Sequence, residues 1–152
     1  MTVVAIWLID RVGRRVLLLS GTIGMAFALF VVAGTFAIGG DTLGHTASIV
    51  AVVGLVVYTG SFAIGLGPVF WLLISEIYPA RIRGKSMSIA AIANWAANFV
   101  VAVTFLTLLN AISNSGTFLL MGFLSLVAVV YFWRKVPETR GLTLEEIERE
   151  MA

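Results

Sequence analysis

Residues 46–75 read TASIVAVVGLVVYTGSFAIGLGPVFWLLIS and contain no Asp, Glu, Lys or Arg. A helix crosses the hydrocarbon core of a bilayer with about 20 apolar residues, so this stretch is longer than one straight span needs. It contains Gly60, Gly65, Gly67 and Pro68. Because proline lacks an amide hydrogen and its ring crowds the preceding turn, we expect the helix to break or kink here. Interrupted helices at membrane depth line a cavity or are buried in protein, so a binding site and a simple packing kink both stay open.

Three further stretches of the chain are long, apolar and uncharged. They are Val16 to Ile38, Ser86 to Leu109 and Thr117 to Trp133, the last of them near the short limit for a span. We therefore predict an all-α integral membrane protein with four transmembrane helices at about 16–38, 46–75, 86–109 and 117–133, within a transmembrane part that covers residues 1–136. Thr2 to Ile9 would rise only about 12 Å as a helix, so we interpret it as the stump of one.

The composition fits a bilayer better than water. Apolar residues make up 60% of the chain and charged residues 12%, against roughly 45 to 50% and about 25% in soluble domains. The chain has no Cys and a single His, which excludes disulfides and leaves no metal-ligand cluster. No loop combines a nucleophile, a base and an orienting group, so we expect no enzyme, no metal and no cofactor. Nothing in the sequence supports nucleic-acid binding.

Charged residues predict how the spans are oriented. All ten basic residues fall in alternate loops or chain ends: Arg11, Arg14, Arg15, Arg81, Arg83, Lys85, Arg134, Lys135, Arg140 and Arg149. The remaining loops, at 39–45 and 110–116, carry only Asp41 and His45. By the positive-inside rule, both chain ends face the cytoplasm in a cell membrane, either a plasma membrane or a bacterial inner membrane.

Two short patterns concern local structure. Thr143 and the Glu three residues later match a capping box, which predicts a short acidic helix at about 144–151 in a cytoplasmic tail over 137–152. Small residues at Ser20, Gly24 and Ala28 recur every four positions. This spacing predicts close approach of the first span to a neighbouring helix.

Three motifs resemble the sugar porter family of the major facilitator superfamily. They are Asp10-Arg-Val-Gly-Arg-Arg15, the run from Gly67-Pro-Val-Phe-Trp71 to Arg83, and Pro137-Glu-Thr-Arg-Gly141. Each alone is a modest signal, but together they occur in the family's order and spacing over nearly the whole chain. The resemblance implies twelve helices in two lobes, with substrate held between the lobes. This chain would hold helices nine to twelve and the end of helix eight, a partial second lobe that is inactive without the amino-terminal lobe.

The resemblance also implies a sugar site on the interrupted helix and on the third span. An indole offers an apolar face and one N–H donor to a pyranose, and an amide offers donors and an acceptor to its hydroxyls. For the tryptophan the alternative is an interfacial belt residue, and for the asparagines it is contact between helices. Ala63 stands where animal glucose facilitators would have Glu, which favours a microbial-type or other sugar porter. The candidate substrate-binding residues are Gly67, Pro68, Trp71, Asn94, Trp95 and Asn98.

The loop charges form a second candidate site. In the family, opposite charges lock the two lobes on the inner side and separate when the cavity opens inward. Because an exposed ion pair contributes only about 0 to 1 kcal/mol, a lock needs several pairs. Ordinary positive-inside topology is the alternative. The candidate gate residues are Asp10, Arg14, Arg15, Glu76 and Arg83, and the tail motif that would position the tail against the inner loops is Pro137, Glu138, Thr139, Arg140 and Gly141.

Taken together, the sequence predicts a secondary transporter of monosaccharides (hexose, pentose or cyclitol) working by alternating access. Its partners would be the sugar, the bilayer and the missing amino-terminal lobe of the same transporter. Protons as a coupling ion stay open, because proton-linked members carry the titratable acid in the first lobe. Two alternatives are a membrane sugar sensor that does not transport and a small four-span membrane protein.

Overall fold

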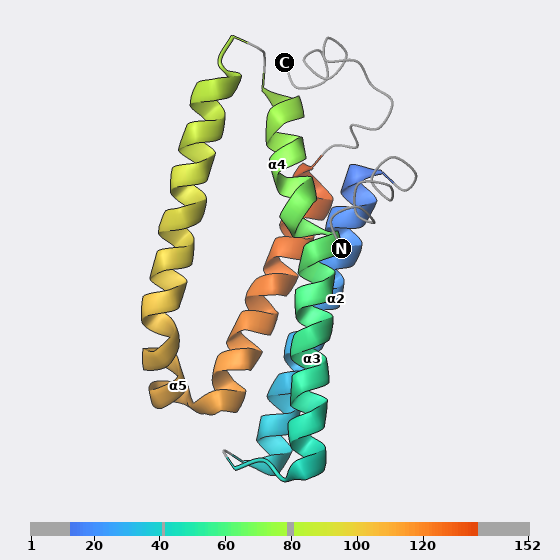
Figure 1. Ribbon diagram of the computed structural model, residues 1–152, viewed down its shortest axis with the longest axis vertical. Coiled ribbons are helices and arrows are strands. Elements are labelled where there is room, and N and C mark those ends of the chain that lie inside the picture. Colours follow the sequence, from blue (N-terminus) through green and yellow to red (C-terminus); the bar gives the residue numbers. More distant parts are fainter. Residues whose placement is uncertain (1–12, 41, 79–80, 137–152) are drawn as a thin grey trace.

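The computed structural model describes residues 13–40, 42–78 and 81–136, and every element within them is helical (Figure 1). The helices are α2 (Arg14–Gly39), α3 (His45–Ile64), α4 (Leu66–Ile77) and α5 (Arg83–Lys135). Three stretches are long and apolar enough to cross a membrane: Arg14–Gly39, His45–Ser75 and Arg83–Lys135. The expected stump, Asp10, the tail motif and the tail helix lie outside the described residues, as do the side chains of residues 76 and 77.

Helix α5 consists of two helical arms joined by a sharp reversal. Ile112 (φ −126°, ψ 16°) and Ser113 (φ 65°, ψ 169°) leave the helical conformation. The first arm (residues 83–111) and the second arm (residues 114–135) therefore run in opposite directions (Figure 1). Ser113 caps the second arm, because its Oγ accepts a hydrogen bond from the Gly116 amide at 3.4 Å.

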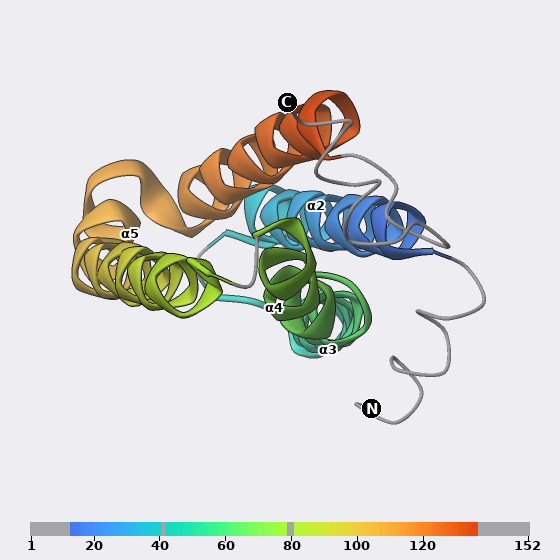
Figure 2. The same cartoon turned by 90° about the horizontal axis from the view of Figure 1, so that it is seen from above.

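Helix α2 lies between the α3–α4 pair and the second arm of α5 (Figure 2). At one end of the bundle, Leu17 and Leu18 form a buried cluster with Val69 and Leu73 of α4. On the side of the second arm, the Phe30 ring meets Phe123 edge-on, with ring centroids 5.5 Å apart. The most buried helix of the described part is thus the one that contacts all the others.

The backbones of α2 and α3 touch where α3 ends. A Cβ atom at Gly21 would lie 2.7 Å from the Cα of Gly65 and 2.9 Å from the Ser61 carbonyl oxygen. Neither position accepts a larger residue without a backbone shift. In lipid, where both helices already avoid water, such close packing of small residues is a main source of helix association.

The predicted small-residue stripe is partly wrong. Gly24 faces the Ser61 side chain and Ala28 is buried, as expected. Ser20, however, is exposed, and its hydroxyl donates to the Leu17 carbonyl of its own helix at 3.2 Å. Gly21, one position further, makes the contact instead, because the helix turns about 100° per residue and the partner selects the face.

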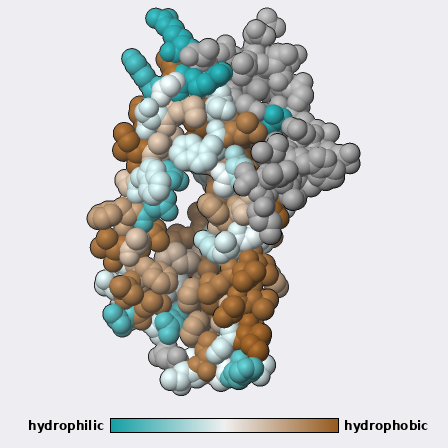
Figure 3. All heavy atoms as spheres, in the orientation of Figure 1, coloured by the Kyte–Doolittle hydropathy of each residue, from teal (hydrophilic) through white to brown (hydrophobic). Residues whose placement is uncertain are grey.

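Apolar side chains cover much of the coloured face that Figure 3 shows. Ile38 is 93% exposed and Trp95 is 71% exposed. A soluble protein rarely leaves such large side chains in water over a wide area, whereas lipid or further protein accommodates them.

The described basic residues lie at one end of the bundle. The start of α2, the end of α4, the start of the first arm and the end of the second arm all point toward that end (Figure 1). The connection from α2 to α3 and the reversal at Ser113 lie at the opposite end. This arrangement agrees with the grouping of basic loops in the sequence.

The Gly21 contact predicts an asymmetric effect of alanine. Gly21→Ala should destabilise the fold by about 1 to 3 kcal/mol through overpacking against Gly65. Gly34→Ala on the same helix meets nothing within 4 Å and should be neutral or slightly stabilising. Thermal loss of the helical circular-dichroism signal in detergent measures both. Equal melting temperatures would contradict the backbone contact.

Candidate functional site

The predicted interruption of the long apolar stretch is confirmed, and it falls at Gly65. Helix α3 ends at Ile64, and Gly65 has non-helical dihedral angles (φ −95°, ψ −91°) before α4 begins at Leu66. Pro68 has no amide to donate to the Ile64 carbonyl four residues earlier, and its ring crowds that carbonyl. The proline therefore lies in the first turn of α4, where a missing amide hydrogen costs least.

Trp71 projects away from the core that α4 forms. Val69 and Leu73 are buried against Leu17 and Leu18. Trp71 lies two positions from each of them, about 200° round the helix, and it is 39% exposed. Its ring packs edge-on to Phe70, with centroids 5.2 Å apart. One face of the indole is thus left available on α4.

Asn94 and Asn98 share one face of the first arm, as predicted from their spacing. The Asn98 Nδ2 donates to the Asn94 carbonyl at 2.9 Å and to the Asn94 Oδ1 at 3.1 Å. Asn98 therefore holds the oxygen of the Asn94 side chain, and the Asn94 amide nitrogen keeps its donors for other partners. Trp95 beside them is 71% exposed.

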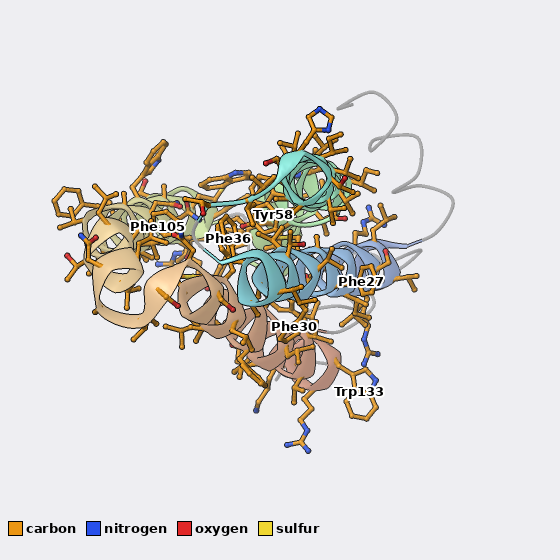
Figure 4. The ribbon with its side chains drawn as sticks, turned by 90° about the horizontal axis from the view of Figure 1, so that it is seen from below. Phe27, Phe30, Phe36, Tyr58, Phe105 and Trp133 are labelled. Atoms are coloured by element: carbon orange, nitrogen blue, oxygen red, sulfur yellow. The ribbon has the colours of Figure 1, made fainter. Side chains whose placement is uncertain are left out.

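A central hollow lies between α2, α3, α4 and both arms of α5. Its volume is about 390 Å³. Figure 4 shows Tyr58, Phe36 and Phe105 in the region between α3 and α5, and Tyr58 and Phe105 line the hollow. The Thr22 hydroxyl donates to its own helix at 2.7 Å, as the Ser125 hydroxyl does at 3.0 Å. Among the polar side chains that line this hollow, Tyr58 is therefore the one whose hydroxyl does not donate a hydrogen bond to its own helix.

None of Trp71, Asn94 and Trp95 lines that hollow. Sequence reasoning missed Tyr58, although a lone tyrosine among aliphatic residues in an uncharged span was a usable signal. Ala63 lines a separate hollow of about 410 Å³ along α3, with residues such as Thr59 and Gly60. The small side chain at Ala63 helps to keep this second hollow open.

The candidate gate residues that the structure describes lie at the basic end of the bundle. Arg15 Nη2 donates to the Trp133 carbonyl, tying the start of α2 to the end of the second arm. Arg83 Nε donates to the Tyr78 carbonyl at 3.3 Å. Arg14 is half-buried at the first position of α2. Asp10 and the Glu76 side chain lie outside the part of the chain that the structure describes. The pairing of opposite charges therefore stays a prediction.

Comparison with known proteins decides the family. The model of the family described as "Sugar (and other) transporter" matches residues 1–151. The chain belongs to the sugar transporter family. Membership confirms the resemblance drawn from the three motifs, and it confirms that this sugar transporter chain is not an enzyme.

Two curated relatives illustrate the match. The chain is 42% identical to D-xylose-proton symporter-like 2 of Arabidopsis thaliana, over 97% of this chain and 28% of that protein. It is 41% identical to the facilitated trehalose transporter Tret1 of Drosophila yakuba, over 99% of this chain and 18% of that protein. The sugar transporter chain thus spans less than a third of the length of these relatives.

Solved structures confirm the fold class. The inward open xylose transporter XylE from E. coli superposes with a TM-score of 0.85 at 38% identity, over 98% of this chain and 32% of that one. The proton:xylose symporter XylE bound to 6-bromo-6-deoxy-D-glucose gives 0.86 at 36% identity, over 99% and 32%. The sugar transporter chain is therefore an all-α, multi-pass membrane protein with part of a major facilitator bundle.

The Arg15 contact predicts a local effect at the end of the second arm. Arg15→Ala should lower the free energy of local opening at residues 132–136 by about 1 kcal/mol, the net contribution of one hydrogen bond. Amide hydrogen exchange at these residues should then be roughly five-fold faster. Arg81→Ala, which removes an exposed charge at the same end, should leave their exchange unchanged. Equal exchange rates in the two variants would contradict a stabilising role of the hydrogen bond from Arg15 to the Trp133 carbonyl.

Proposed function

We propose that this chain forms part of the second lobe of a secondary transporter that carries monosaccharides by alternating access. The observation that carries the proposal is the break at Gly65, after which Trp71 lies on the face of α4 opposite to its buried residues. Broken helices in secondary transporters commonly line the substrate path near the middle of the membrane. The relatives' names support a sugar as the cargo, since they include a xylose symporter and a trehalose facilitator.

Trp71 and Asn94 supply the two kinds of contact that a sugar needs. The exposed indole face of Trp71 receives the C–H side of a pyranose. The Asn94 amide nitrogen donates to a hydroxyl, and Asn98 orients the Asn94 side chain from one turn away. Trp95 extends the apolar surface beside them, and Gly67 and Pro68 hold the first turn of α4 in place. The remaining contacts come from helices of the transporter outside this chain.

The basic end of the bundle is the cytoplasmic end in this proposal. Seven basic residues of the described part lie there, which the positive-inside rule assigns to the cytoplasm. Asp10, Arg14, Arg15, Glu76 and Arg83 then act together at the inner mouth, locking the lobes while the cavity is open outward. The transporter lies in a cell membrane, and either facilitated diffusion or proton symport fits these residues.

The orientation is tested by cysteine labelling, because the chain has no native Cys. In sealed right-side-out vesicles, Ser113→Cys should react with a membrane-impermeant thiol reagent. Lys85→Cys should react only after the vesicles are opened. Labelling of both variants from the same side would contradict the orientation, and labelling of Lys85→Cys alone would invert it.

The sugar site is tested by uptake in the full-length transporter that contains this chain. Trp71→Ala and Asn94→Ala should each lower kcat/KM for a transported sugar at least ten-fold, with xylose, glucose and trehalose tried as substrates. Asn98→Ala should have a smaller effect, because Asn98 only orients Asn94. Membrane abundance, measured in parallel, should stay unchanged.

Trp133→Ala is the matched control for the tryptophan. Trp133 is 61% exposed, and only its backbone carbonyl bonds to Arg15. Unchanged uptake in the Trp71 and Asn94 variants would remove the site assignment. Sugar binding without counterflow in the unaltered protein would show a sensor in place of a transporter.

A further inference from the structure

A groove follows the outer face of the second arm of α5. It has a volume of about 530 Å³, and its lining changes from apolar to cationic along the helix. The lining residues are Phe123, Leu126, Val127, Val130, Tyr131, Arg134 and Lys135. All seven come from one arm, at the three- and four-residue spacing of a single helical face.

The groove has the length of one membrane leaflet. The second arm of 22 residues (114–135) rises about 33 Å, close to the thickness of a hydrocarbon core. Phe123 stands near its middle and Lys135 at its end, about 18 Å apart along the axis. The groove therefore runs from the bilayer centre to the headgroup region, on the side where the basic residues gather.

The two ends of the groove differ in chemistry. Near the centre, Val127 and Phe123 are more than half exposed, and the Phe123 ring also packs against Phe30 of α2. At the headgroup end, Arg134 and Lys135 are exposed in the last turn. Tyr131 lies between the two parts, where an aromatic ring with a polar tip suits the membrane interface.

We propose that this groove binds one anionic glycerophospholipid. An acyl chain lies along Phe123, Val127 and Val130, and the phosphate sits between Arg134 and Lys135. A guanidinium donates two parallel hydrogen bonds to phosphate oxygens, and the ammonium adds a second positive charge. The paired cations favour a headgroup that keeps its net negative charge over a zwitterionic one. This site is separate from the sugar site, and it stands whether or not the proposed sugar contacts hold.

The test is native mass spectrometry of the full-length transporter that contains this chain, titrated with phosphatidylglycerol or with phosphatidylcholine. Phosphatidylglycerol should be retained at lower concentration. The double variant Arg134→Gln/Lys135→Gln should weaken its retention at least ten-fold, since each removed charge costs about five-fold near a membrane surface. Retention of phosphatidylcholine should be unchanged.

Two further variants separate a site from a general charge effect. Arg81→Gln/Lys85→Gln removes the same charge from the same end of the bundle and should leave phosphatidylglycerol retention unchanged. Val127→Trp fills the apolar part and should weaken retention of both lipids. Equal retention of the two lipids by the unaltered protein, or an equal loss in both double variants, would overturn the proposal. Full lipid retention by Val127→Trp would also overturn the proposal. It would mean that the lipid binds elsewhere, as it must if another part of the transporter covers the groove.

Discussion

Backbone contact between Gly21 and Gly65 sets α2 directly against the break that separates α3 from α4. With no side chains between them, the two helices lie close enough for α4 to bury Val69 and Leu73 on the first turns of α2. This packing fixes the rotation of α4, and the rotation in turn directs Trp71 outward. The proposed sugar contact on α4 therefore depends on two glycines that touch no ligand.

The fold class was predictable because uncharged stretches of about 20 residues have few other uses, and the proline forecast the interruption. The position of the interruption at Gly65 was not predictable. Pro68 constrains the whole preceding turn, but it does not determine which residue of that turn leaves the helical conformation. The helix contact that was predicted at Ser20 and found at Gly21 has a similar explanation. A period of four identifies a stripe of small residues, but the neighbouring helix decides which stripe it uses. Tyr58 gave a signal as a single polar residue in an uncharged span, but a search for spaced motifs does not detect one residue on its own.

Hydroxyl groups within the spans are mostly satisfied inside their own helices. Thr22, Thr35 and Thr104 each donate to a carbonyl four residues earlier, at 2.7 to 2.8 Å. Such bonds remove the cost of placing a hydroxyl in lipid and leave it little capacity to bind anything else. Against that background, the Asn94 amide nitrogen and the Tyr58 hydroxyl are polar groups that keep hydrogen-bonding capacity for a ligand. The number of polar residues in a span is therefore less informative than which of them already form hydrogen bonds within their own helix.

The reversal at Ser113 has a mechanical consequence. The first arm measures about 42 Å from the reversal to Arg83, and its apolar side chains, such as Phe99 and Leu106, are largely exposed. The displacement that a rotation produces grows with the distance from the point of rotation. A tilt of about 10° at the reversal would carry the far tip sideways by about 7 Å over such a length. A change in the backbone angles at Ser113 would therefore displace the Arg83 end of the first arm most, at the end of the bundle where the described arginines lie.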